Sequence, residues 1–246
     1  MPGNKKVALV TGATRGIGFE TARQLGQKGI AVAVGGRTEQ EAKTAADKLV
    51  AEDIEAYPVA VDVTNDADRK AAARFISEKF GKLDILVNNA GVAGKGGLLN
   101  PHTIETTEEE LESVFNTNLF SVVAITREFL PLLKKSTAGR IVNLGSIVGS
   151  LTLQAMPNSP ITPFKAFAYN ASKTALNQFT VHLAAELRDT TIKVNSAHPG
   201  WVKTELGTQH AQMEIADGAK TSVDLALIGD DGPNGKFIHL GQELPC

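Results

Sequence analysis

Short runs of apolar, mostly β-branched residues recur along the chain, and their residues are apolar throughout rather than alternately. A strand buried on both faces has such a continuous apolar run, and strands that alternate with helices form parallel sheets. Helical patterns separate the runs, so the sequence predicts an α/β fold with a doubly wound sheet of seven parallel strands and helices on both faces. The runs lie at residues 7–10, 31–34, 59–61, 85–87, 141–144, 192–194 and 237–240.

The clearest helical pattern begins at Thr107, which forms a capping-box pattern with Glu110 ahead of an apolar stripe. Asn118 lies in the middle of this pattern, among apolar residues. Asparagine is unfavourable in a helix interior because its side chain competes for backbone hydrogen bonds. We therefore expect a kink or a water site at Asn118.

The bulk composition is that of one domain. The chain has 246 residues, 42% of them hydrophobic, and no repeat or linker-like segment divides it, so residues 1–246 form a single predicted domain. The net charge of −2, without a Lys/Arg-rich run, argues against nucleic acid and membrane surfaces as partners. The longest apolar stretches, such as residues 122–125, are far shorter than the ~20 residues that span a bilayer.

Cysteine usage and the N-terminus point to the cytoplasm. Cys246 is the only cysteine, so no internal disulfide can form, which fits a reducing compartment. Residues 1–6 lead directly into the first predicted strand without the apolar core of a signal peptide. We expect a cytoplasmic protein, and we expect no metal ion in its site.

A glycine-rich loop follows the first predicted strand and precedes a helical pattern. Gly12 permits a tight turn, Gly16 lets the backbone approach a pyrophosphate, and Gly18 lets the helix pack closely on the strand. The Gly-x-x-x-Gly-x-Gly spacing differs from that of the commoner fingerprint. The alternative is a glycine turn without a ligand. The strand-turn-helix context favours a dinucleotide site, and with it a Rossmann fold.

The residues after the second predicted strand bear on the choice of cofactor. A site selective for NAD places a carboxylate near Gly36 to bind the ribose 2′-hydroxyl, and the sequence has none there. Arg37, together with Arg15 in the glycine loop, can instead bind a 2′-phosphate through charge-assisted hydrogen bonds. This predicts NADP(H) as the cofactor. The alternative is that Arg37 merely begins a solvated helix.

Polar residues also follow the third and fourth predicted strands. Asp62 and Val63 follow the third, and residues 88–91, Asn-Asn-Ala-Gly, follow the fourth. Open parallel sheets bind ligands at the carboxyl ends of their strands, so both segments are candidates for cofactor contact. Asp and Asn-Gly clusters also favour turns, which is the simpler explanation for each segment by itself.

Tyr169 and Lys173 stand four positions apart at the start of a long helical pattern. On a helix, side chains at i and i+4 lie on the same face, so this phenol and this ammonium would be neighbours. A free phenol has a pKa near ~10. A cation beside it is expected to lower that pKa and to bring proton transfer nearer neutrality. Taken in isolation, the pair is more simply a tyrosine at an interface beside a solvated lysine.

Taken together, these motifs resemble those of the classical short-chain dehydrogenase/reductase family. The resemblance covers nearly the whole chain, in the order that the family has. The elements that carry it are residues 11–18, Asp62, residues 88–91, Asn118, Ser146, Tyr169 with Lys173, and Pro199 with Gly200. The segments 197–204 and 231–235 resemble the carbonyl-reductase branch in particular.

The resemblance implies a catalytic tetrad of Asn118, Ser146, Tyr169 and Lys173. Tyr169 would donate a proton to the carbonyl oxygen while Ser146 hydrogen-bonds the same oxygen. Lys173 would lower the pKa of the phenol and hold the nicotinamide ribose, and Asn118 would order a water that connects Lys173 to solvent. The simpler alternatives are an ordinary strand-end serine and a satisfied polar core asparagine.

The resemblance also implies which residues bind the cofactor. They are Gly12, Thr14, Arg15, Gly16, Ile17, Gly18, Arg37, Asp62, Val63, Asn89, Ala90, Gly91, Tyr169, Lys173, Pro199, Gly200, Val202 and Thr204. Residues 151–167 and 201–222 are expected to form substrate-site loops within the single domain.

The connection between Ser146 and Tyr169 is longer than in compact members of the family. The extra residues, 151–167, include three prolines and several large apolar side chains. Loops over the carboxyl edge of a sheet commonly contact substrate, so we expect an apolar or aromatic carbonyl substrate. The alternative is a loop that packs its own hydrophobic cluster. In some carbonyl-reductase relatives a longer insertion blocks tetramer formation, so monomer, dimer and tetramer all remain open.

The sequence therefore predicts an enzyme that reduces a ketone or aldehyde with NADPH, or oxidises the alcohol in reverse. Its partner is a small molecule whose identity the sequence does not name. The alternatives are a 3-oxoacyl-thioester reductase of the same family, a sugar-nucleotide epimerase, and a protein that senses the NADP redox state without turnover. Epimerases have a different glycine spacing and a substantial C-terminal domain, and redox sensors typically lose the tyrosine or the lysine.

Overall fold

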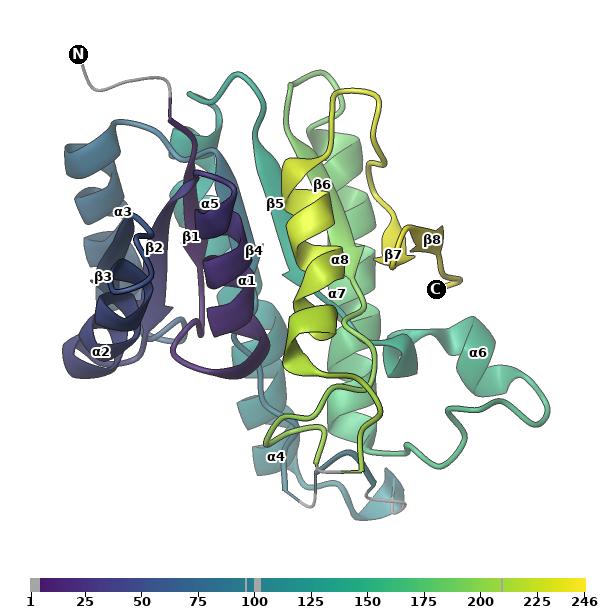
Figure 1. Ribbon diagram of the computed structural model, residues 1–246. Helices are drawn as coiled ribbons and strands as arrows, with labels where there is room; N and C mark the ends of the chain where they lie inside the picture. The colour runs from purple at the N-terminus through teal and green to yellow at the C-terminus, as the bar shows by residue number, and fades with distance from the viewer. Residues whose placement is uncertain (1–4, 96, 100–102, 209) are drawn as a thin grey trace.

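The helices and loops of the protein are arranged around one β-sheet. The computed structural model describes residues 5–95, 97–99, 103–208 and 210–246. In those residues the sheet has eight strands in the order β3-β2-β1-β4-β5-β6-β7-β8, and neighbouring strands are parallel except β7 and β8 (Figure 1). The strands are β1 (Val7–Val10), β2 (Ala31–Gly36), β3 (Ala56–Ala60), β4 (Ile85–Asn88), β5 (Arg140–Leu144), β6 (Lys193–Ala197), β7 (Phe237–His239) and β8 (Gln242–Glu243).

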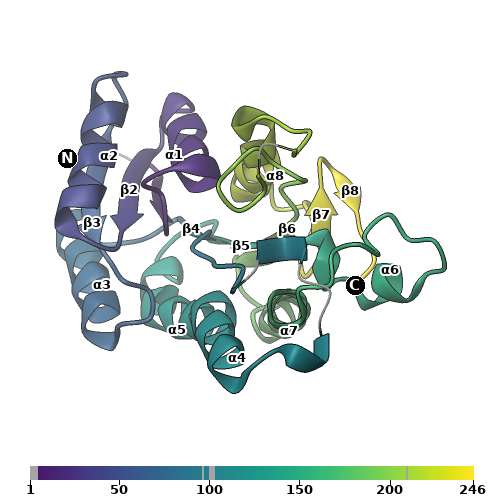
Figure 2. The same ribbon diagram turned by 90° about the horizontal axis from the view of Figure 1, so that it is seen from below.

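Helices cover both faces of the sheet, and a hydrophobic core fills each interface (Figure 2). One face carries α1 (Gly16–Gln27), α2 (Glu39–Val50) and α8 (Ile215–Leu227). The other face carries α3 (Asp66–Phe80), α5 (Ser121–Leu133) and α7 (Phe167–Glu186). Leu25 and Leu49 are fully buried in the first core, and Phe129 is fully buried in the second. This arrangement confirms the predicted doubly wound α/β fold.

The eighth strand is the one departure from the predicted sheet of seven. The last predicted strand ran to Leu240, but β7 ends at His239. Leu240 and Gly241 have φ angles of 45° and 81°, which form a tight turn instead of extended backbone. The chain then returns as the two-residue β8, antiparallel to β7. A strand this short has no apolar run, so the sequence pattern did not predict it.

The helix predicted from Thr107 forms in three parts. α4 (Glu108–Phe115) begins where the Thr107 hydroxyl accepts a hydrogen bond from the Glu110 N–H at 3.2 Å. A π-helical turn, η3 (Asn116–Phe120), follows and leads without a break into α5. A π turn widens the helix locally, so the irregularity expected at Asn118 is confirmed.

The carboxyl ends of the strands point toward α4 and α6 at the bottom of Figure 1. Four short helical elements lie near that edge, and their bounds are η1 (Gly97–Leu99), η2 (Thr103–Glu105), η4 (Ile147–Gly149) and α6 (Leu151–Ala155). Parallel sheets of this kind bind ligands at the carboxyl edge of the strands. The predicted site residues are therefore expected to lie at this edge.

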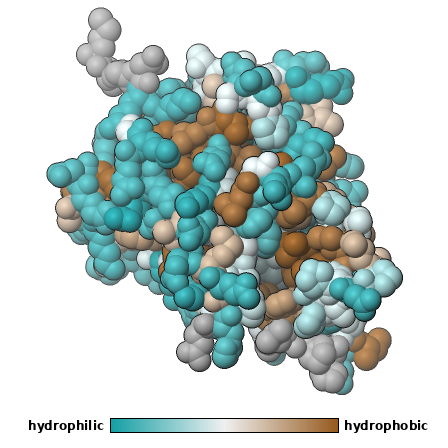
Figure 3. Space-filling model, turned by 45° about the vertical axis from the view of Figure 1, so that its right-hand side comes forward, coloured by the Kyte–Doolittle hydropathy of each residue, from teal (hydrophilic) through white to brown (hydrophobic). Residues whose placement is uncertain are grey.

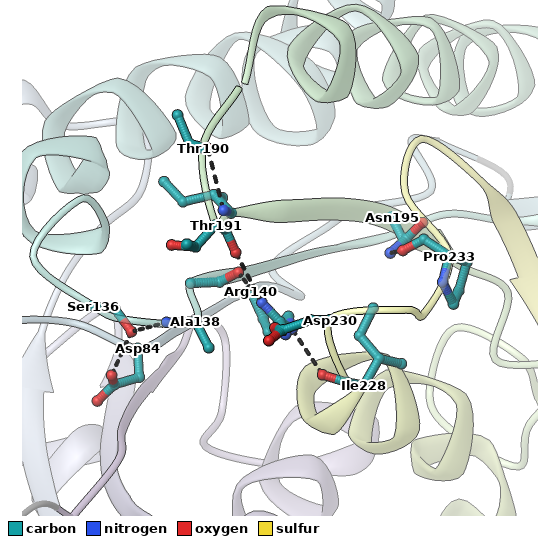
Figure 4. A network of polar contacts seen from close by, with 12 residues as sticks. Asp84, Ser136, Ala138, Arg140, Thr190, Thr191, Asn195, Ile228, Asp230 and Pro233 are labelled. Carbon is teal, nitrogen blue, oxygen red and sulfur yellow. Dashed lines mark hydrogen bonds and ion pairs between the residues drawn. The ribbon is translucent and has the colours of Figure 1, made fainter. Parts of the chain in front are cut away.

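A buried arginine holds together the opposite, amino edge of the sheet (Figure 4). Arg140 is 2% exposed, and its guanidinium donates to the carbonyls of Gly139, Thr191 and Ile228 at 2.8–3.1 Å. It also pairs with Asp230 at 3.2 Å. Buried charges are tolerated where hydrogen bonds replace the lost water, so this contact joins β5, the start of β6 and the end of α8.

In the described part of the chain, no helix is both long enough and apolar enough to cross a bilayer. Figure 3 brings forward the side that carries α6 and the C-terminal strands. Its apolar side chains gather in separate patches among polar ones.

Candidate active site

The glycine loop between β1 and α1 has the strained and crowded backbone that its sequence predicts. Gly12 and Gly16 have φ angles of 61° and 57°, which side-chain-bearing residues rarely adopt. A Cβ atom at Gly18 would lie 2.3 Å from Asn89 Nδ2 and 2.5 Å from the Gly12 carbonyl oxygen. The first two glycines are thus needed for backbone shape and the third for close packing.

The loop after β4 is fastened to the glycine loop. Asn89 Nδ2 donates to the carbonyls of Thr11 and Gly12 at 2.8 and 3.0 Å. The Thr11 hydroxyl accepts from the N–H groups of Asn89 and Ala90 at 3.0 and 3.1 Å. Asn88 points the other way, into the core, where its amide donates to Asn143 Oδ1 at 2.8 Å. Asn89 therefore shapes the cofactor loop, whereas Asn88 stabilises the sheet beneath it.

The N-terminus of α1 fits an anionic group such as a pyrophosphate. Within α1, whose residues are all described, the first turn contains no acidic residue, and Arg15 at the N-cap makes no side-chain cap. The first N–H groups of a helix attract anions. Thr204, from the loop after β6, lies near the same place, since a Cβ at Gly16 would be 3.7 Å from its Cγ2.

The end of β2 has no room for a carboxylate. A Cβ at Gly36 would lie 2.7 Å from Thr14 Cγ2 and 2.9 Å from the Ala42 backbone nitrogen. Arg37 and Arg15 are 72% and 74% exposed at their side chains. Hydrogen bonds from Thr64, the largest cause, and the nearby charge of Arg37 lower the pKa of the Asp62 carboxyl.

The partly buried Ser146 and the buried Tyr169 and Lys173 come together at the carboxyl edge of the sheet. Tyr169 is 7% exposed and Lys173 is 4% exposed. The Ser146 side chain lies within hydrogen-bonding reach of the Tyr169 phenol. Lys173 Nζ donates to the Leu144 carbonyl at 2.7 Å and lies 5.6 Å from the centroid of the Tyr169 ring. The end of β5 and the start of α7 thus hold all three side chains, as the predicted tetrad requires.

The expectation that Lys173 lowers the pKa of Tyr169 is wrong for the polypeptide by itself. Burial raises the pKa of Tyr169 to about 12, against a smaller lowering by the Ser146 hydrogen bond. Burial also lowers the pKa of Lys173 to about 8. Lys173 bonds a carbonyl rather than the phenol oxygen, and loss of water penalises both charged forms. The phenol is therefore protonated at neutral pH.

Asn118 occupies the π turn and is fully buried. Its amide donates to the Val92 carbonyl at 2.9 Å and to the Ser172 hydroxyl at 3.0 Å, and its Oδ1 accepts from the Val92 N–H at 2.9 Å. A Cβ at Gly91 would lie 3.3 Å from Asn118 Oδ1 and 3.7 Å from Lys173 Nζ. The structure thus brings Asn118 close to Lys173 around Gly91.

Ser172 is a site neighbour that the sequence reasoning did not single out. Its hydroxyl accepts from Asn118 and donates to the Tyr169 carbonyl at 2.7 Å. It is fully buried between Tyr169 and Lys173 along α7. A serine on the buried face of a helix, three positions after Tyr169, was the available signal, because such a hydroxyl needs a partner.

An apolar wall stands beside Tyr169. Val148, Ile161 and Ala166 are buried with it in one cluster. The partly buried side chains that pack against this cluster are Ala93, Leu98, Ile147, Leu153 and Phe164. The wall draws residues from the loops after β4 and β5 as well as from the predicted insertion.

The insertion at residues 151–167 is only partly an apolar wall. Leu153 and Phe164 pack against the Tyr169 cluster, but Leu151, Met156 and Phe167 are 65%, 50% and 43% exposed. Five of its residues form α6, and Phe167 already belongs to α7. Residues 201–222 are likewise not all loop, because α8 begins at Ile215.

The loops from the two predicted segments meet through aromatic side chains. The rings of Phe164 and Trp201 are 5.6 Å apart in an edge-to-face arrangement. Trp201 Nε1 donates to the Gly207 carbonyl at 2.7 Å, which fixes its ring. Val202 is buried and leaves Gly218 of α8 no space for a side chain, since a Cβ there would lie 2.5 Å from it. The turn at Pro199 and Gly200 connects this region to β6.

Two cavities lie beside the cluster of Ser146, Tyr169 and Lys173, and the second shares Val148 with the apolar wall. A groove of about 490 Å³ lies between α5 and α7, lined by Phe120, Val123 and Phe179 among others. A second cavity of about 370 Å³ lies between α6 and α7, beside Leu151 and Phe167. Neither is lined by Ser146, Tyr169 or Lys173. The chemistry of the side chains, rather than cavity size, identifies the site.

Comparison with known proteins agrees with the class that the fold and this site define. The family model for short chain dehydrogenases matches residues 6–215. The chain belongs to the short-chain dehydrogenase/reductase family. It is thus an oxidoreductase of a family that uses nicotinamide cofactors, and ketone or alcohol redox chemistry is the activity its relatives support.

Three similar proteins illustrate the relationship. (+)-Neomenthol dehydrogenase of Arabidopsis thaliana is 32% identical, over 96% of this chain and 97% of its own. Carbonyl reductase 1 (NADPH) of Mus musculus is 31% identical, over 97% of this chain and 98% of its own. The crystal structure of NADPH-bound carbonyl reductase from chicken fatty liver has a TM-score of 0.85 and 26% identity, and the match covers 98% of this chain and 99% of that one.

Proposed function

We propose that this protein reduces a ketone or aldehyde to the alcohol with NADPH, and that Tyr169 donates the proton. The observation that carries the proposal is the cluster of the partly buried Ser146 with the buried Tyr169 and Lys173. A proton donor must hold its proton at working pH, and burial of the phenol ensures this. Sensors that bind without turnover have no need of such a cluster.

The chain's own residues each have a task in this reaction. When bound, the nicotinamide cofactor supplies a hydride to the carbonyl carbon. Negative charge then develops on the carbonyl oxygen, where the hydroxyls of Ser146 and Tyr169 donate hydrogen bonds and Tyr169 gives up its proton. Lys173, held by the Leu144 carbonyl, supplies positive charge beside the resulting phenolate. Asn118 would order the water through which the proton is replaced.

We propose that Gly12, Gly16 and Gly18, with the N-terminus of α1, hold the pyrophosphate of the cofactor. The absence of space at Gly36 and the exposed guanidiniums of Arg15 and Arg37 support NADP(H) over NAD(H). Two of the similar proteins described above carry NADPH in their names. The remaining predicted cofactor contacts, from Thr14 to Thr204, belong to the same proposal.

We propose that the substrate has an apolar or aromatic portion. Leu153, Phe164 and Leu98 line the approach to Tyr169, and Trp201 closes it through its contact with Phe164. Apolar area of this kind contributes about 25 cal/mol per Å² buried. Small polar carbonyls cannot use that area and should bind weakly.

The test is an initial-rate assay of NADPH oxidation with aryl ketones, diketones, quinones and short aldehydes. Tyr169→Phe is expected to bind NADPH nearly as well as the unmodified protein, because the ring still packs, and to lose turnover by roughly 10²–10⁴-fold, the usual contribution of a positioned acid. Cofactor binding is measured separately by fluorescence. Near-normal turnover in Tyr169→Phe would refute the assignment of the proton donor, and no turnover with any carbonyl in the panel would favour a binding protein.

A further inference from the structure

His198 lies between the two loops of the proposed site and is almost fully buried. It follows β6 directly and is 7% exposed. Its Nδ1 accepts hydrogen bonds from the backbone N–H groups of Ile147 at 3.3 Å and of Gly200 at 3.4 Å. One ring nitrogen is thus shared by two donors from different parts of the chain.

The two donors belong to functionally important segments. Ile147 is the residue after Ser146, whose hydroxyl lies within hydrogen-bonding reach of Tyr169. Gly200 forms, with Pro199, a turn that belongs to the proposed cofactor contacts. The ring of His198 therefore sets how far the Ser146 hydroxyl lies from that turn.

The geometry also fixes the protonation state of the ring. A nitrogen that accepts from two N–H groups cannot carry a proton, so the ring is neutral with its hydrogen on Nε2. Burial, and to a smaller degree His239, lowers the pKa of His198 to about 3. His239 from β7 is the titratable side chain placed against it, with ring centroids 4.8 Å apart, and the Phe237 ring on the same strand is uncharged.

His239 holds the backbone of the same residue. Its Nδ1 lies 2.9 Å from the His198 carbonyl, and since a carbonyl can only accept, this Nδ1 carries a hydrogen. Gly200 has a φ of 89°, and a Cβ there would lie 2.1 Å from Met213 Sδ and 3.3 Å from His239 Cε1. The turn therefore has no space for a side chain at Gly200, between Met213 and His239.

We infer that His198 is a positioning residue for the reaction: its unprotonated Nδ1 ties the Ser146 loop to the Pro199-Gly200 turn. The inference rests on the proposed function for its catalytic consequence, and on the ring geometry for its structural part. The two parts are tested by different measurements.

The first measurement is independent of activity. Two-bond ¹H–¹⁵N spectra of the histidine rings report which nitrogen carries the proton. His198 is expected to show the neutral Nε2–H form across about pH 5 to 9, a range in which free histidine titrates. His239 is the internal control and should show a hydrogen on Nδ1. An Nδ1–H form of His198, or its protonation within that range, would overturn the inference even if the protein reduces carbonyls as proposed.

The second measurement compares two variants. Asparagine can place its Oδ1 near the position of the histidine Nδ1, whereas leucine fills the space without an acceptor. His198→Leu should lower kcat by about tenfold to a hundredfold, the effect of misplacing a reacting group by about 1 Å, with a smaller change in KM. His198→Asn should restore most of that loss.

The outcome of this comparison separates positioning from packing and from the proposed function. Equal kcat in His198→Leu and the unmodified protein, or equal loss in His198→Leu and His198→Asn, would refute the positioning role. If His198→Leu does not fold, the ring spectra of the unmodified protein still test the structural part, and a kcat of His198→Asn close to that of the unmodified protein supports the catalytic part. Retained turnover in Tyr169→Phe would overturn the proposed function instead. It would not affect the tautomer of His198, which the ring spectra determine independently.

Discussion

Tyr169 and Lys173 have lost nearly all contact with water, and this loss governs their protonation more than their contact with each other does. Burial raises the pKa of Tyr169 to about 12 and lowers that of Lys173 to about 8. The first shift keeps a proton ready for donation. The second shift carries a cost, because at neutral pH a buried lysine must either give up its proton or hold its charge without water.

Lys173→Met is therefore expected to raise the free energy of unfolding at neutral pH. Between pH 8 and 10.5 the unfolded chain keeps a proton that folded Lys173 has lost, so the stability of the unmodified protein rises with pH through that window. A pKa unit corresponds to about 1.4 kcal/mol, so removing the shifted lysine should raise the free energy of unfolding by about 3 kcal/mol. The lost hydrogen bond from Lys173 to the Leu144 carbonyl reduces this gain.

Urea denaturation at pH 7 and pH 10 tests this prediction. The advantage of the methionine variant should be largest at pH 7 and should shrink by pH 10. The contribution of Tyr169, with its raised pKa, is lost only as pH rises from 10 toward 12, outside the measured window. A difference that does not change with pH would contradict the assigned shift.

Arg37 provides the second prediction at this scale. Arg37→Asp should lose a charge-assisted contact to a 2′-phosphate and add repulsion, which costs about 1.5–3 kcal/mol or roughly tenfold to a hundredfold in NADPH affinity. NADH affinity should change far less, because NADH has no 2′-phosphate. Arg188→Asp, the same charge change after the far end of α7, is the matched control. Equal losses for NADH and NADPH would contradict the assignment.

Two elements carry departures from regular geometry, and both lie at the site. The π turn at residues 116–120 lets Asn118 point its amide at Val92 and Ser172 instead of disrupting a regular helix. The insertion between β5 and α7 forms the short helix α6 and then returns toward Tyr169 at Phe164. Local irregularities of this kind are found where function requires them.

The insertion offers a matched pair of variants. Phe164 packs against the Tyr169 cluster and the Trp201 ring, whereas Met156 is 50% exposed. Phe164→Ala should raise KM for aryl ketones about tenfold. An edge-to-face aromatic pair contributes about 0.5–1.5 kcal/mol beyond the contribution of the apolar area that it buries. Met156→Ala should leave those values unchanged. Equal changes in KM in the two variants, measured with the same ketones, would show that the insertion does not contact the substrate.

At the scale of the whole molecule, the two edges of the sheet have different tasks. The carboxyl edge gathers the glycine loop, the Asn89 loop and the Ser146–Tyr169–Lys173 cluster. The amino edge contains the buried Arg140 and the buried Asp84, which accepts from the Val7 N–H at 2.9 Å and from the Ser136 hydroxyl at 2.5 Å (Figure 4). Stability and chemistry are therefore separable by mutation.

Arg140→Met should destabilise the fold without altering NADPH affinity. It removes the guanidinium that donates to the carbonyls of Gly139, Thr191 and Ile228, and leaving a buried acceptor unsatisfied costs about 1–3 kcal/mol. Asp230→Asn is the control, because Asp230 is 92% exposed at its side chain and exposed pairs are worth about 0–1 kcal/mol. Urea denaturation gives the stabilities. A large loss in both variants would contradict the view that hydrogen bonds to carbonyls, rather than the ion pair, hold Arg140.

The sequence by itself determined the fold class, the glycine loop and the order of the site motifs, because each is local. Continuous apolar runs specify strands that are buried on both faces, and glycines at fixed spacing specify a turn that other residues rarely adopt. The same local logic placed Tyr169 and Lys173 on one helix face. It also predicted an irregular helix at Asn118, since an amide in a helix interior must find partners.

Only the tertiary structure decided what depends on distant parts of the chain. Burial, which no spacing reveals, reversed the expected shift of the Tyr169 pKa. The apolar wall is assembled from the connection after β4 and the connection between β5 and α7, and this assembly buries part of Phe164 and Leu153 but leaves Met156 and Leu151 in solvent. The role of His198 likewise follows from two N–H donors that lie 51 residues and 2 residues away in sequence. Contacts of this kind exist only once the sheet has brought its strand ends together.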